Sequence, residues 1–129
     1  MRNKSLFAIF VLVLTATGWA AQKRNGPKYD KTNEVTIRGV VQEVKEFECP
    51  ASGGVGAHLV LKTGDNLVLV HLALSKFLKE YGFEFAKGDE LVVVGAKAKV
   101  DEQDGILART IERGNQTLTF RDKDGKPLW

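Results

Sequence analysis

The chain has 129 residues, of which 43% are hydrophobic and 27% are charged, which suits one globular domain rather than several. Its 19 basic residues exceed its 16 acidic residues by three, but Arg2 and Lys4 lie in an N-terminal targeting segment. Without that segment the chain has 17 basic and 16 acidic residues, and this near balance argues against nucleic acid as the partner.

Residues 1–20 have the pattern of a signal peptide. A basic start at Arg2 and Lys4 precedes the apolar run LFAIFVLVL, and the small residues Gly18 and Ala20 flank Trp19 before the expected cleavage. The apolar run is shorter than the roughly 20 residues that span a bilayer. We therefore expect a periplasmic or secreted protein that is not an integral membrane protein after cleavage. The alternative is an uncleaved N-terminal anchor.

Residues 21–33 contain Gly26, Pro27 and several charges without periodicity, and they predict a linker. The domain, residues 34–129, begins with a strand predicted over residues 34–48. A glycine at position 39 and a shift in the apolar phase at Val44 predict a bulge or sharp bend in this strand. The segment 49–56 is rich in Pro, Gly and Ser and predicts a mobile loop that carries Cys49.

The segment 56–72 predicts a hairpin around which the domain is organised. Gly64 and Asp65 form a tight turn between two apolar runs, and counting outward from this turn pairs His58 with His71. Side chains alternate between the two faces of a strand. One face is an apolar core face, formed by Leu59, Leu61, Val68, Val70 and Leu72. The other face carries His58, Val60, Lys62, Leu67, Leu69 and His71.

Residues 73–82 predict one short helix, with Ser75 as its N-cap. Strands follow over residues 90–100, 106–113 and 117–121, and we expect Trp129 to pack back on the domain. The fold class is mostly β. The element order predicts a five-stranded OB-like Greek-key barrel with the helix between strands three and four and an extra C-terminal strand.

Several short stretches resemble small exported bacterial OB-fold proteins to which no function is assigned. The stretches are VTIRGVV from Val35, HLVL from His58, VHL from Val70, KGD from Lys87 and GKPLW from Gly125. This resemblance implies a fold and a compartment, and it implies no chemistry.

The two histidines and the single cysteine are the residues that suggest chemistry. In OB-folds the outer surface of strands two and three typically binds the ligand, and the adjoining loops flank it. Imidazole and thiolate suit zinc or copper. We therefore predict a soft-metal or small-ligand site with His58, His71 and Cys49 as metal ligands. Further ligand contacts are predicted for Val60, Lys62, Leu67 and Leu69.

Other interpretations of the same residues remain open. The histidines can be ordinary residues of a half-buried strand pair, with Cys49 an incidental thiol. The apolar residues Val60, Leu67 and Leu69 can instead contact a protein partner. Binding of nucleic acid or an oligosaccharide rests on fold analogy alone, and the predicted face has no aromatic platform for bases. No motif of a hydrolase or metalloprotease is present, so we expect no enzyme.

Overall fold

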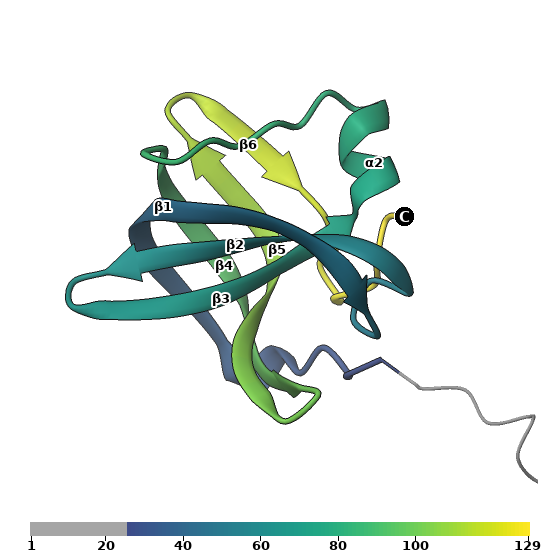
Figure 1. Cartoon of the computed structure of the whole chain (residues 1–129). Helices are drawn as coiled ribbons and strands as arrows, with labels where there is room; N and C mark the ends of the chain where they lie inside the picture. Colours follow the sequence, from purple (N-terminus) through teal and green to yellow (C-terminus); the bar gives the residue numbers. More distant parts are fainter. Residues whose placement is uncertain (1–25) are drawn as a thin grey trace, which may run out of the picture.

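The computed structural model describes residues 26–129 (Figure 1), so the predicted signal peptide lies outside the described residues. The described part is mostly β, as predicted, with six strands in one sheet and one short α-helix. In chain order the elements are η1 (Lys31–Asn33), β1 (Glu34–Cys49), β2 (Gly54–Thr63), β3 (Asn66–Leu74), α2 (Ser75–Glu80), β4 (Glu90–Val100), β5 (Gln103–Arg113) and β6 (Gln116–Thr119).

The sheet curls into a ring because β3, at one edge of the sheet, also pairs with β5 near the other edge. The strand order is β3-β2-β1-β4-β5-β6, and β3 also pairs in parallel with β5 through Val70 and His71. The long strand β1 serves both sides of the ring, pairing with β4 in its first half and with β2 in its second. The predicted bend is present as a register shift between Val41 and Glu43. The more specific OB-fold assignment stays a prediction.

The main core fills the inside of this ring. It takes alternate residues of the hairpin strands, so the predicted core face is correct for Leu59, Leu61, Val70 and Leu72. Phe120, which follows β6, has no exposed surface and adds the largest buried side chain. Burial of aliphatic and aromatic side chains of this size stabilises the ring by about 1.5–3 kcal/mol for each residue.

A second, smaller apolar cluster lies apart from the main core. It consists of Tyr29, Cys49, Ala96, Val100 and Leu107. Leu107 alternates with the core residues Ile106 and Ala108, so it points out of the ring. This cluster covers part of the outer surface of the sheet and brings Cys49 into a buried position.

The end of the predicted linker packs on the domain. Tyr29 is only 9% exposed, and its hydroxyl donates a hydrogen bond of 2.5 Å to Glu34. Arg109 on β5 holds the same carboxylate with two hydrogen bonds of 2.9 and 3.0 Å. These contacts fasten residues 29–34 to β5.

The structure contradicts the sequence prediction at the start of the helix and confirms it at the C-terminus. α2 begins at Ser75 itself, with Leu74 as N-cap and no capping side chain, so the predicted N-cap role of Ser75 was wrong. The reason is that β3 continues to Leu74, which leaves Ser75 inside the first turn with a buried hydroxyl. Trp129 packs back as expected, and its Nε1 donates a 2.9 Å hydrogen bond to the Ser52 carbonyl. No helix within residues 26–129 has the length and apolar character to cross a membrane.

Candidate metal centre

The predicted hairpin register is observed, and it places the two histidines side by side. His58 on β2 pairs with His71 on β3, at the part of the hairpin farther from the tight turn at Gly64. Their rings meet edge to face, with centroids 4.9 Å apart and an interplanar angle of 78°. The turn therefore fixes the register, and the register fixes the histidine pair.

Both histidines are buried, which differs from the half-buried surface expected for them. His58 is 1% exposed and His71 is 4% exposed. They lie on the face opposite the main core, as the alternation of the strand predicts, but other parts of the chain cover that face. Phe47 of β1 stacks on His58, and Leu107 of β5 pairs with His71.

Cys49 joins the histidines from the end of β1. Its Sγ lies 3.5 Å from Nδ1 of His71, and the residue is 5% exposed. The predicted bounds of the loop, residues 49–56, were wrong, because β1 runs to Cys49 and β2 begins at Gly54. The connection is a tight turn in which the Cys49 carbonyl accepts hydrogen bonds from the amides of Ser52 and Gly53. Backbone pairing of both strands thus holds the thiol in place.

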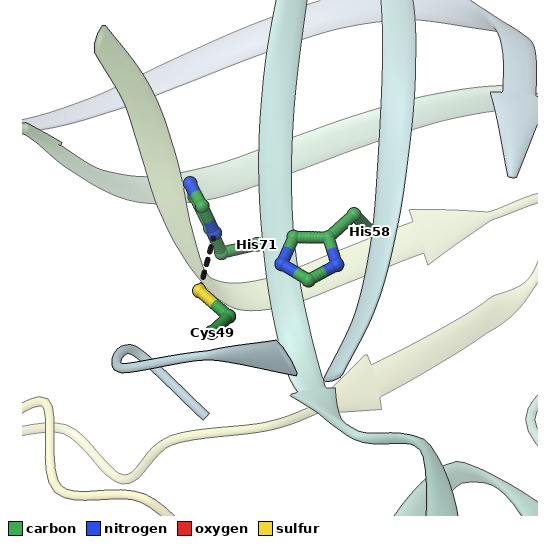
Figure 2. A group of neighbouring side chains, drawn as sticks. All are labelled: Cys49, His58 and His71. Carbon is green, nitrogen blue, oxygen red and sulfur yellow. Dashed lines mark hydrogen bonds between the residues drawn. The ribbon is translucent and has the colours of Figure 1, made fainter. Parts of the chain in front are cut away.

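The three side chains present one ligand atom each within a small volume (Figure 2). All three atoms lie within 4.8 Å of one another. Metal–sulfur bonds of about 2.3 Å and metal–nitrogen bonds of about 2.0–2.1 Å place two ligands of one ion roughly 3.3–3.8 Å apart. The contact between Cys49 and His71 already has this spacing. The separations from His58, which are at most 4.8 Å, need to shorten by up to about 1.0–1.5 Å to complete a three-ligand set.

Each histidine also has a buried ring nitrogen without a hydrogen-bond partner in the described residues. These atoms are Nδ1 of His58 and Nε2 of His71. A buried polar atom left unpaired costs about 1–3 kcal/mol, so such atoms are uncommon in folded domains. The His71 nitrogen that faces Cys49 is Nδ1, so an ion bound between these two residues would leave Nε2 of His71 without a partner.

The surroundings keep both rings neutral at neutral pH. Burial, followed by the neighbouring His71, lowers the pKa of His58 to about 4. Burial, followed by the positive charge of Arg121, lowers the pKa of His71 to about 4, against a smaller opposing effect of Asp101. Neutral imidazole is the form that binds metal ions, so the ligands need no deprotonation at the rings.

Phe47 is the residue of this site that the sequence analysis missed. Its ring lies against His58 and separates it from solvent. The signal was present in the alternation of β1, because Phe47 and Cys49 are two residues apart and therefore share a face. Opposite them on β2 stand Gly56 and Gly54, and a Cβ atom at Gly56 would lie 2.1 Å from Oγ of Ser52 and 3.3 Å from Cε1 of His58.

The remaining predicted ligand contacts lie on the same face of the hairpin but outside the three-residue set. Val60 pairs with Leu69, and Lys62 pairs with Leu67, successively nearer the turn. Exposure increases in that direction, and Leu67 is 65% exposed. The face is therefore divided into a buried end with the histidines and an open end with an apolar strip.

The comparisons with known proteins identify a family for this chain. No curated protein is significantly similar to this chain. The model of the MamS/MamX magnetosome protein family matches residues 33–118, which is most of the described ring. The matched region includes β1 to β5 and all three residues of the candidate metal centre. The chain therefore belongs to the MamS/MamX magnetosome protein family.

Proposed function

We propose that this domain binds one soft transition-metal ion through Cys49, His58 and His71. The observation that carries the proposal is the convergence of the only cysteine and both histidines of the chain on one buried point. They come from three strands, so the fold and not local sequence brings them together.

The ligand chemistry favours copper or zinc. One thiolate and two imidazoles form a set of soft and borderline donors, which suits both metals better than a set of carboxylates does. The only methionine is Met1, so no thioether ligand is available within residues 26–129. Three protein ligands leave a position for a fourth, exogenous ligand when the metal prefers four.

We further propose that the protein is exported, as residues 1–20 suggest, and holds the metal without catalysing a reaction. Phe47 and the second apolar cluster enclose the ligands, whereas a catalytic metal needs an open path for its substrate. Membership in a magnetosome family supports a role of this binding at the magnetosome.

The proposal is tested by following the two imidazoles by NMR while metal is added to the reduced, metal-free protein. Zinc and copper(I) are added in separate titrations. Binding predicts saturable shifts of both rings at one equivalent, with a Kd below micromolar. His71→Ala removes a ligand and abolishes these shifts, whereas Lys62→Ala, on the same face but outside the set, leaves them unchanged. Weak broadening that does not saturate contradicts the proposal.

A second candidate function is contact with a protein partner through the apolar strip of Val60, Leu67 and Leu69. Its support is the 65% exposure of Leu67, which is the largest exposure among the large apolar residues described. Replacement of Leu67 by Lys tests this function separately, because Leu67 lies outside the metal set. Loss of self-association or of a bound partner, with metal binding intact, supports it, and no change in either argues against it.

A further inference from the structure

A pocket that contains none of the candidate metal ligands lies where three chain segments converge. Residues 26–29, residues 50–53 and residues 121–129 line a pocket of about 590 Å³. The walls are stiff because all three prolines of the chain belong to them. The segments are also close together, since a Cβ atom at Gly26 would lie 2.5 Å from the Pro50 carbonyl oxygen.

A buried arginine forms the polar part of this pocket. Arg121 is 5% exposed, and its guanidinium lies between two aromatic rings, 5.5 Å from the centroid of Tyr29 and 5.1 Å from that of Trp129. Its Nη1 donates a 2.9 Å hydrogen bond to the Gly125 carbonyl. Nε is buried without a partner, and Nη2 makes no hydrogen bond with residues 26–129.

No carboxylate of the described residues neutralises this arginine, because the acidic groups nearby have other partners. Asp122 accepts hydrogen bonds of 2.9 Å from the amides of Asp124 and Lys126, which closes the turn beside Arg121. Asp124 forms an ion pair of 3.8 Å with Lys31. A guanidinium does not lose its proton in a protein, and a buried charge without a counter-charge is unfavourable.

The charged residues at the rim add to the positive potential. The pocket is lined by three basic residues, Arg121, Lys28 and Lys126, against the single acidic residue Asp124. Both lysines are exposed, so they can approach a ligand that enters from solvent. The planar fork of a guanidinium matches the two oxygens of a carboxylate or phosphate group.

We propose that this pocket binds a small molecule with a carboxylate or phosphate group, which completes the coordination of the buried Arg121 guanidinium. The two aromatic rings and the Gly125 carbonyl hold the guanidinium in position before the ligand arrives, which reduces the entropy lost on binding. Lys28 and Lys126 attract the anion and contact its outer oxygens. None of the lining residues is a candidate metal ligand, so the proposal does not require a bound metal, although Arg121 lies near enough to His71 to lower its pKa.

The test uses the fluorescence of Trp129, which lines the pocket. The full chain with Trp19→Phe retains Trp129 as its one tryptophan. In the presence of a metal chelator, inorganic phosphate and succinate are titrated separately at constant ionic strength, with chloride as the reference anion. The expected result is a saturable change with at least one of the two probes, which identifies the group preferred, and no saturable change with chloride.

Two variants separate binding at this site from general attraction of anions. Arg121→Gln removes the fork and should weaken binding about tenfold or more, whereas Arg121→Lys keeps the charge and should weaken it less. If the buried variants do not fold, the exposed Lys126→Ala provides the comparison, with a weakening of a few-fold. If the Trp19→Phe protein, with all native pocket residues, shows no saturable binding of either probe, the proposal is overturned. Equal binding by a folded Arg121→Gln variant overturns it too.

Discussion

The phenyl ring of Phe47 lies flat on the imidazole of His58, with centroids 3.7 Å apart and planes inclined by 9°. His58 belongs to the candidate metal-binding set and is buried, while Phe47 itself is 39% exposed. The phenyl ring is thus the layer between His58 and solvent, and it is a candidate gate for a metal ion that enters or leaves.

We predict that Phe47→Ala speeds metal release. Loss of the ring exposes one face of His58 to water and to chelators, so dissociation should accelerate about tenfold while the three ligands remain. The half-exposed position implies a loss of stability of about 1–2 kcal/mol, less than for a fully buried phenylalanine. Stopped-flow transfer of bound zinc to a chromophoric chelator measures the rate. Phe47→Leu, which keeps an apolar cover, is the control, and equal rates for all three proteins contradict the gating role.

The metal-free protein should lose stability as the pH falls from about 6.5 to about 4. Burial lowers the pKa of both His58 and His71 to about 4 in the folded state, from an ordinary value of 6.5. The unfolded chain therefore takes up more protons in this interval, and acid favours unfolding. The stability contributed by the neutral rings is complete above pH 6.5 and is lost as the pH approaches 4. It amounts to at most roughly 3 kcal/mol for each histidine.

Urea unfolding of the chelator-treated protein at several pH values measures this loss. The double variant His58→Gln/His71→Gln is the control, and its stability should depend much less on pH in the same interval. Glu34, whose pKa is lowered first by its hydrogen bonds from Arg109, contributes mainly below its ordinary value of 4.5, at the acid end of this interval and beyond it. A wild-type protein as insensitive to pH as the double variant would show that the histidines are not buried.

Gly105 on β5 is expected to be necessary for the position of His71. A Cβ atom there would lie 3.0 Å from Nε2 of His71 and 2.9 Å from the Leu69 carbonyl oxygen. Gly105→Ala should therefore displace the ring, destabilise the fold by about 1–3 kcal/mol and weaken metal binding. The matched control is Gly114→Ala, at a turn with positive φ and open space, where backbone strain alone acts. Thermal unfolding and zinc titration of both variants distinguish the effects, and unchanged zinc affinity in Gly105→Ala is the opposing result.

The contact between Tyr29 and Glu34 should be visible in a tyrosine titration. Burial, and then the hydrogen bond to Glu34, raise the pKa of Tyr29 to about 12. Glu34→Gln removes the negative charge next to the phenol, so the pKa should move toward 10. Ultraviolet absorbance of a Tyr81→Phe background isolates Tyr29, because the chain has two tyrosines. A pKa that does not respond to Glu34→Gln would contradict the contact.

The hairpin was predictable because its register depends only on local sequence. Gly64 adopts a positive φ of 60° at the turn, and the residues on either side alternate without interruption as far as His58 and His71. A two-residue turn leaves one pairing of these strands, so the histidine pair follows by counting. The inward face with Leu59 and Leu61 follows from the same alternation.

The burial of the site was not predictable in this way, because it depends on contacts between distant parts of the chain. Tyr29, from the predicted linker, and Leu107, from β5, enclose Cys49 in the second cluster. The end of β1 was also ambiguous, since Pro50 and three glycines nearby resemble a loop in composition. Pairing of Cys49 with Gly54 decides that this residue belongs to the strand. Such pairing is tertiary information that composition does not contain.

X-ray absorption at the metal edge tests the central claim most directly. The reduced protein is loaded with one equivalent of zinc, and the nearest ligand shell is compared with that of Cys49→Ser. The account predicts one sulfur at about 2.3 Å and two imidazole nitrogens at about 2.0–2.1 Å, with the sulfur absent in the variant. A shell of oxygen and nitrogen alone in the wild-type protein, or two sulfurs from two chains, would contradict a site made by Cys49, His58 and His71 of one molecule.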